Sequence, residues 1–134
     1  MSFLKIGELA TQTETSVETL RYYEAEGLIP EPRRSDSGYR LYTADDVDRV
    51  HFIRRARAMD FSLKEVGELL SLQVDREHAT CGEVKLLAQQ KLHAIESKMA
   101  ELQKMKQALK QITDACEGGE LSALHCTILD ALEH

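Results

Sequence analysis

Aromatic residues are scarce in this chain of 134 residues, where they make up 5%, and tryptophan is absent. Two prolines and seven glycines are too few for the composition of a disordered segment. No apolar run exceeds three residues, so no segment approaches the roughly 20 apolar residues that span a bilayer. The N-terminus also lacks the pattern of a secretory signal. We therefore expect a cytoplasmic protein with no membrane partner.

Cysteine is sparse as well, and its count of three is odd. An odd count argues against a disulfide framework, and in a reducing compartment a cysteine is more often a metal ligand, a redox thiol or a small core residue. The sequence has no glycine-rich phosphate loop, no Ser/His/Asp set and no HExxH motif. We therefore expect a protein that is not an enzyme.

The formal net charge is −6, which by itself argues against binding to nucleic acid. The distribution of charge matters more than the sum, because all but one of the basic residues before residue 60 are arginines. The planar arginine side chain suits both phosphate and guanine. Most of these arginines fall into two clusters: Arg33, Arg34 and Arg40, and Arg54, Arg55 and Arg57. A local basic face on an acidic protein is therefore possible.

Apolar periodicity predicts short helices over the first 75 residues. A first helix around residues 6–10 is followed by an interruption at 13–16, and Ser16 begins a second helix that should end at Gly27. Two short helices separated by such a turn form a helix-turn-helix pattern. Residues 30–42 then predict a small hairpin. Thr43 caps a third helix, and Ser62 with Glu65 forms a capping box that begins a fourth.

A long helix is predicted from Cys81 to Cys116, because apolar residues recur there every seven positions. At about 1.5 Å per residue it would be about 50 Å long, too long to bury its apolar stripe on a small head. We therefore expect it to pair with a second copy of the chain. A short terminal helix is predicted at 126–134.

Several sequence strings occur in a fixed order along the chain. They are Ile6-Gly7-Glu8-Leu9-Ala10, Glu18-Thr19-Leu20-Arg21-Tyr22-Tyr23-Glu24, Gly27-Leu28, Arg34-Ser35, Gly38-Tyr39-Arg40-Leu41-Tyr42 and Phe52-Ile53-Arg54. Together they resemble the MerR family of bacterial transcription activators, over essentially the whole chain. The tail is similar to the metal-sensing branch of that family, in which one Cys begins the dimer helix and two bracket a later loop. Cys81, Cys116 and Cys126 match these positions.

The resemblance implies a mainly α fold in three parts. They are a winged helix-turn-helix DNA-binding domain at residues 1–75, a hinge with an antiparallel coiled-coil dimerisation helix at 76–116, and a metal-binding loop with a short helix at 117–134. The candidate DNA contacts lie on the second helix, its N-terminus and the hairpin, which would act as the wing. They are Thr15, Ser16, Arg21, Tyr23, Arg33, Arg34, Tyr39 and Arg40.

An antiparallel dimer with twofold symmetry gives the cysteines a shared location. If Cys81 faces Cys116 of the partner chain, the two long helices cross between Lys98 and Met99, and apolar residues face each other along the seam. Cys126 follows Cys116 after nine residues that include two glycines, enough chain to fold back as a loop. Three thiolates from two chains would then surround each of two metal sites.

The identity of the metal is less constrained. The family's copper(I) and gold(I) sensors carry Ser in place of Cys81, so the resemblance implies a divalent ion. The nine-residue loop resembles the zinc-responsive members, yet those typically have adjacent cysteines and a loop His where this chain has Glu117 and Leu121. Zinc takes four ligands, which His125, His78, Glu117 or water would complete, whereas cadmium(II), lead(II) or mercury(II) accept three thiolates. We favour zinc, with His125 as its fourth ligand.

The resemblance implies a homodimer that binds palindromic promoter DNA and, on binding metal, distorts the operator so that RNA polymerase can act on a metal-efflux or detoxification promoter. Deforming DNA in this way costs several kcal/mol, which protein contacts must offset. A cadmium, lead or mercury sensor of the same family is one alternative. Another is a thiol-redox or metal-storage coiled-coil protein that does not bind DNA, and a third is a DNA-binding regulator whose signal is an oxidant or an organic cation.

Overall fold

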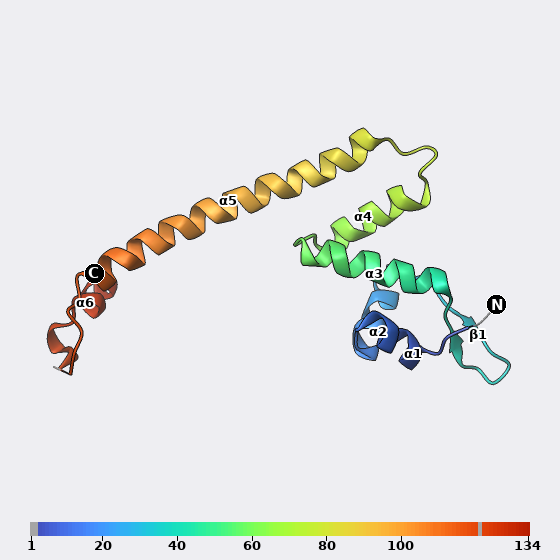
Figure 1. Cartoon of the computed structure of the whole chain (residues 1–134), viewed down its shortest axis with the longest axis horizontal. Coiled ribbons are helices and arrows are strands. Elements are labelled where there is room, and N and C mark those ends of the chain that lie inside the picture. Colours follow the sequence, from blue (N-terminus) through green and yellow to red (C-terminus); the bar gives the residue numbers. More distant parts are fainter. Residues whose placement is uncertain (1–2, 121) are drawn as a thin grey trace. The chain divides into compact units, whose positions relative to one another are not determined.

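The computed structural model describes residues 3–120 and 122–134 and is mainly helical (Figure 1). None of the helices in these ranges is long and apolar enough to cross a membrane. In chain order the elements are α1 (Ile6–Thr13), α2 (Val17–Ala25), β1 (Arg33–Arg34), β2 (Arg40–Leu41), α3 (Ala44–Ala58), α4 (Leu63–Val74), α5 (Cys81–Asp114), the 3-10 turn η1 (Ala123–His125) and α6 (Thr127–Glu133).

The chain divides into two compact units, one reaching to Ala88 and the other beginning at Gln89. The first contains α1 to α4 and the hairpin, which we call the head, together with the start of α5. The second contains the rest of α5, η1 and α6. The functional boundaries near residues 75 and 116 remain predictions from sequence.

The predicted helix-turn-helix is confirmed in α1 and α2. α1 ends at Thr13, and the next residue, Glu14, adopts a left-handed φ of 54° that closes the helix. Ser16 is the N-cap of α2, where its hydroxyl accepts a hydrogen bond of 3.1 Å from the Thr19 backbone N–H. Gly27, with φ 78°, follows the end of α2. Each helix contributes a fully buried leucine to the same core, Leu9 from α1 and Leu20 from α2.

The predicted hairpin is confirmed, although its strands have only two residues each. β1 and β2 pair in antiparallel register, with Arg33 opposite Leu41 and Arg34 opposite Arg40. A further bridge joins Leu4 to Tyr42, which ties the residues before α1 to the end of the hairpin. This bridge links segments far apart in the sequence, so no local pattern could predict it.

The predicted caps of α3 and α4 are confirmed. Thr43 with Asp46 and Ser62 with Glu65 form capping boxes at their N-termini. Two arginines of the second cluster bind backbone carbonyls inside the head, because Arg54 donates to the Thr13 carbonyl and Arg57 to the Phe61 carbonyl. These two side chains therefore hold the fold together, and only Arg55 of that cluster remains open as part of a basic face.

One hydrophobic core holds the head together. Its buried members come from every helix of the head, the loops after α2 and α3, and the end of the hairpin: Leu9, Ala10, Leu20, Tyr23, Leu28, Ile29, Tyr42, Val50, Ile53, Ala56, Phe61, Val66 and Leu70. Helices α1 to α4 and the end of the hairpin therefore share one packed core.

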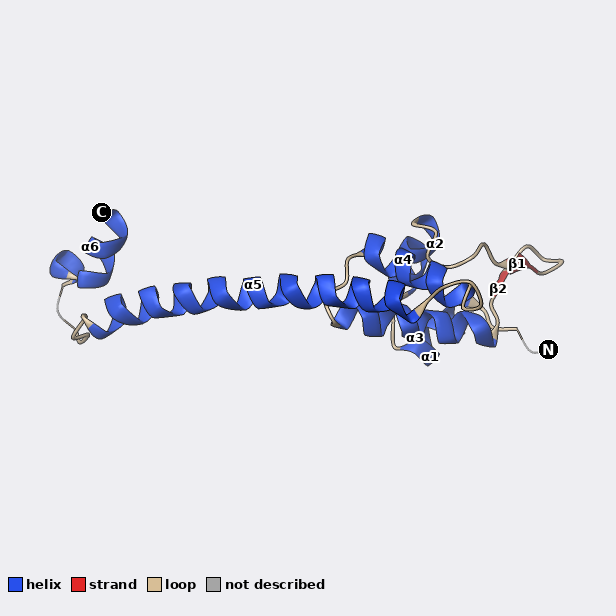
Figure 2. Ribbon diagram, turned by 90° about the horizontal axis from the view of Figure 1, so that it is seen from above, coloured by secondary structure: helices blue, strands red, loops and turns tan. Residues whose placement is uncertain are grey.

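The predicted long helix is confirmed as α5, a continuous helix of 34 residues (Figure 2). None of its residues is buried in this single chain. Seven of its large apolar side chains are at least 43% exposed: Val84, Leu86, Leu92, Met99, Leu102, Met105 and Leu109. Three others, Leu87, Ile95 and Ile112, are half-buried. After it, the predicted terminal helix is confirmed as α6. The turn η1 was not predicted, because three residues are too short to show a periodic pattern.

Candidate nucleic-acid interface and metal-binding loop

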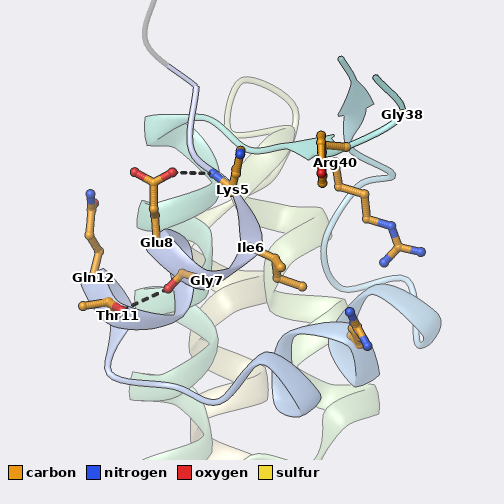
Figure 3. Close-up of a pocket in the computed structure, with 10 residues that line it drawn as sticks. Lys5, Ile6, Gly7, Glu8, Thr11, Gln12, Gly38 and Arg40 are labelled. Carbon is orange, nitrogen blue, oxygen red and sulfur yellow. Dashed lines mark hydrogen bonds between the residues drawn. The ribbon is translucent and has the colours of Figure 1, made fainter. Parts of the chain in front are cut away.

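A hollow of about 910 Å³ lies in the head between α1, α2 and the hairpin (Figure 3). Its lining includes three basic side chains and one aromatic ring, those of Lys5, Arg21, Arg40 and Tyr39. Arg21 reaches it from α2, Tyr39 and Arg40 from the hairpin, and Lys5 from the residue before α1. One acidic side chain, that of Glu8, lines it as well. The fold thus brings three of the predicted DNA contacts to one concave surface on which basic side chains outnumber acidic ones.

The hairpin residues of this surface are held in different ways. The Tyr39 ring is 59% exposed and lies 4.7 Å from the Lys5 ammonium group, a cation–π contact. Arg40 donates a hydrogen bond of 2.9 Å to the Glu24 carboxylate. Arg34 donates one of 2.9 Å to the Gly38 carbonyl within the hairpin, and Arg33 is exposed on β1. Arg33 and Arg34 are therefore accessible to a phosphate backbone beside the hollow.

The two hydroxyl candidates lie in the turn before α2. The Thr15 hydroxyl contacts the Thr13 hydroxyl at 2.6 Å, and the Ser16 hydroxyl caps α2 and also contacts the Thr19 hydroxyl at 2.8 Å. Their hydroxyls are already hydrogen-bonded within the protein. What this turn offers a phosphate is chiefly the N-terminus of α2, with its first backbone N–H groups.

Tyr23 is the least accessible of the predicted DNA contacts, and its role stays a prediction. Its ring is only 8% exposed and packs in the core of the head. Tyr23 belongs to the apolar stripe of α2, and this position outweighs the polar tip of the side chain. The neighbouring Tyr22 is 50% exposed, so an aromatic contact from α2 would come from Tyr22.

The second candidate site is a hollow of about 590 Å³ in the loop after α5. Cys116, His125 and Cys126 all line it, and so does Glu117. Gly118 and Gly119 lie between Cys116 and His125 and turn the chain there. Their φ values of 72° and 91° belong to a conformation that residues with a side chain rarely adopt. The fold therefore brings together two of the three predicted thiol ligands and the predicted imidazole.

The environment of Cys126 favours its thiolate form. Cys126 is the N-cap of α6, and the backbone N–H groups of Leu129 and Ile128 lower the pKa of its thiol, although none makes a full capping hydrogen bond. Desolvation of the Cys126 thiol raises its pKa, and the nearby Cys116 side chain lowers it. A lower pKa reduces the competition between protons and a metal ion for the sulfur.

Cys81 is exposed and is the first residue of α5. The turn before it is fixed by a capping box, in which the Glu83 N–H donates to the Thr80 hydroxyl at 3.1 Å and the Thr80 N–H donates to the Glu83 carboxylate at 3.2 Å. Cys81 belongs to the other compact unit of the chain than Cys116. The structure describes one chain, so the approach of Cys81 to Cys116 of a partner stays a prediction.

The remaining ligand candidates differ in how they are held. His78 contacts the Asp75 carboxylate through Nδ1 at 2.6 Å, and both side chains are exposed. Leu121 lies outside the described residues. An exposed group at the C-terminus, Asp130, Glu133 and His134, has ligand atoms within 4.8 Å of one another, an arrangement common among surface acidic residues.

Two residues of the candidate interface were not predicted from sequence. Lys5 lines the basic hollow and contacts Tyr39. Glu24 holds Arg40, and it lies within one of the sequence strings listed above. Both act through contacts between segments more than a dozen residues apart, which leave no periodic signal.

Two family models match the chain. The model described as MerR HTH family regulatory protein matches residues 4–73, and the model described as MerR, DNA binding matches residues 47–112. The first covers the head and the second continues along α5. The order of the matches agrees with the order of the sequence strings.

Individual relatives extend the match over nearly the whole chain. The HTH-type transcriptional regulator ZntR of Escherichia coli K12 is 45% identical over 129 residues, 96% of this chain and 92% of ZntR. The solved structure of PbrR691 from Ralstonia metallidurans CH34 in complex with lead(II) is 40% identical with a TM-score of 0.83, covering 96% of this chain and 98% of PbrR691. MerR from Bacillus megaterium MB1 in complex with mercury(II) is 32% identical with a TM-score of 0.74, covering 98% and 100%. The chain therefore belongs to the MerR family.

Proposed function

We propose that this chain is a transcriptional regulator that binds promoter DNA and responds to a divalent metal ion, zinc(II) in preference to cadmium(II), lead(II) or mercury(II). The observation that carries the proposal is the pairing of a basic hollow in a helix-turn-helix head with a loop that gathers Cys116, His125 and Cys126. The 45% identity with ZntR favours zinc. The relatives named above are regulators, which favours regulation over enzymatic activity, metal storage or thiol redox chemistry.

The working form is a homodimer joined along α5. The apolar side chains of α5 are exposed in the single chain, and Leu102, Met105 and Leu109 line a shallow groove of about 510 Å³. A second α5 in antiparallel orientation would cover this stripe and the rest of the seam. Each head would then occupy one half-site of a palindromic operator.

The metal site consists of Cys116 and Cys126 from one chain and Cys81 from the other, with His125 as the fourth ligand for zinc. The donors fit zinc, because thiolates and an imidazole are its usual ligands and Cys126 is predisposed to the thiolate form. A bound divalent ion would offset two of the three negative charges of the thiolates and would hold the three cysteines together. Because the site draws on both chains, its occupation changes how the two heads are held on DNA, and RNA polymerase acts on the resulting operator shape.

Two arginine variants test binding to DNA. Arg21→Ala is expected to lower affinity for the specific duplex by about 1 to 3 kcal/mol, because Arg21 lies on the recognition helix and lines the hollow. Arg33→Ala is expected to weaken all duplexes about equally and to reduce the salt slope by about one, because Arg33 is exposed beside the hollow as a phosphate contact. Mobility-shift titrations at two salt concentrations, with a palindrome selected from random duplexes, measure both effects.

Lys104→Ala is the matched control, because it removes one positive charge from the exposed surface of α5 outside the head. It should leave affinity and salt slope unchanged. If Arg21→Ala and Arg33→Ala also bind like the wild type, the proposed DNA-binding surface is wrong.

A further inference from the structure

A set of polar contacts, which we call the joint, connects α2, the proposed recognition helix, with the hairpin, the proposed wing. It is built around the carboxylate of Glu24. The Oε2 atom of Glu24 accepts a hydrogen bond of 2.9 Å from Arg40, and its Oε1 atom accepts one of 2.7 Å from the Tyr42 hydroxyl. Glu24 belongs to α2, whereas Arg40 begins β2 and Tyr42 follows it. The joint thus connects the element that enters a DNA groove with the element expected to lie on the flanking backbone.

The surroundings make this joint strong. The Glu24 side chain is 11% exposed and Tyr42 is fully buried, so solvent screens their contacts little. A charged partner roughly doubles the strength of a hydrogen bond relative to a neutral pair. Burial and the contact with Glu24 raise the pKa of Tyr42 to about 12, so its hydroxyl remains a proton donor throughout the physiological range.

The same contact changes the role of Arg40. Its guanidinium is 39% exposed and already paired with Glu24, so much of its positive charge is neutralised before DNA arrives. A phosphate contact on the wing needs a free cation, and Arg33, exposed on β1, meets that need better. Arg40 is therefore better placed to hold the wing than to bind the backbone.

We propose that Glu24 is a positioning residue for DNA recognition: by holding Arg40 and Tyr42, it sets the position of the wing relative to α2. Arg40 acts with it as a positioning residue and does not contact phosphate itself. The proposal rests on the proposed DNA-binding function, but the effect of Glu24 on the wing can also be measured in the free protein.

The direction in which Glu24→Gln changes DNA affinity shows whether Arg40 contacts phosphate or positions the wing. If Arg40 contacts phosphate, Glu24→Gln frees its charge, and DNA affinity and salt slope rise. If Glu24 positions the wing, the same variant loosens the hairpin and lowers affinity, by about fivefold or more, the lower end of typical couplings between sites. Arg40→Met should lower DNA affinity by a similar factor. The double variant should bind DNA as tightly as the weaker-binding single variant, because both substitutions break the same contact.

Glu26→Gln is the matched control. It removes the same negative charge two residues away, at the exposed C-cap of α2, and reports any general gain from reduced repulsion of DNA. Tyr42→Phe, which removes only the hydroxyl, should weaken binding in the same direction as Glu24→Gln. Circular dichroism melting of each variant identifies a temperature at which all are folded, and binding is compared there.

Amide hydrogen exchange in the free protein provides the readout that needs no DNA. Glu24→Gln should accelerate exchange at Leu4 and Tyr42, whose backbone groups form the hairpin bridge, while amides of α1 keep their protection. Higher DNA affinity for Glu24→Gln beyond that of Glu26→Gln, or unchanged exchange at the bridge, would overturn the proposal. If the wild type binds no selected duplex, the proposed function fails and the exchange result alone decides the role of Glu24.

Discussion

A mixed dimer that joins a Cys81→Ser chain to a Cys116→Ser chain is expected to bind one zinc(II) ion, whereas the homodimer of either variant is expected to bind none at its sensing sites. In the proposed antiparallel dimer each site takes Cys81 from one chain and Cys116 and Cys126 from the other. Both defects of the mixed dimer fall in one site, so the other keeps every thiol. The effect is all-or-none, because losing one of three thiolates removes a principal ligand.

Differently tagged chains allow the mixed dimer to be purified, and metal content can then be measured by elemental analysis at equal protein concentration. A dimer that joins Cys116→Ser to Cys126→Ser is the control: each of its sites lacks one thiol, so it should bind no metal. If the mixed Cys81/Cys116 dimer also binds none, or if the Cys81→Ser homodimer binds a full complement, each site is formed within one chain.

His125→Ala is expected to weaken zinc binding by at least about 10- to 100-fold, the range seen even for residues that only support a ligand. His125 lines the same hollow as Cys116 and Cys126, and zinc needs a fourth donor to complete a tetrahedron. Lead(II) and cadmium(II) should lose much less, because three thiolates suffice for softer ions. Competition titrations with a chromophoric chelator give the three affinities.

His78→Ala is the matched control, because it removes an exposed imidazole that is paired with Asp75 in the turn before α5. It should leave zinc affinity unchanged. An equal loss for all three ions in His125→Ala would show that His125 acts through loop structure. Unchanged zinc affinity in His125→Ala would leave His78, Glu117 or water as the fourth ligand, and a loss of zinc affinity in His78→Ala would then identify His78.

The elements that the sequence predicted well are those with local signals. Ser16, Thr43 and Ser62 each begin a helix, because a hydroxyl that accepts a backbone N–H within three residues acts the same way in any fold. The long periodic stripe of α5 is equally local. These signals lie within one or two turns of chain, so tertiary packing has little power to override them.

The features that the sequence did not predict depend on contacts between distant segments. Tyr23 is buried because the apolar stripe of α2 faces the core. Arg54 donates a hydrogen bond to the carbonyl of Thr13, which lies far away in the sequence. The joint at Glu24 spans 18 residues to Tyr42. A charged or aromatic residue type narrows the possible roles, but only the fold decides which partner it meets.

Transcription in vitro from a promoter that carries the selected palindrome is the most direct test of metal control. With wild-type protein bound to this operator, zinc(II) is expected to raise transcript yield by about 5- to 150-fold, the range of typical couplings between two sites. Cys116→Ser protein should occupy the operator equally well and give no response to zinc, because Cys116 lines the hollow of the loop and not the head. Equal transcript yields with and without zinc, from an operator that footprinting shows to be occupied by the wild type, would contradict a metal-responsive regulator.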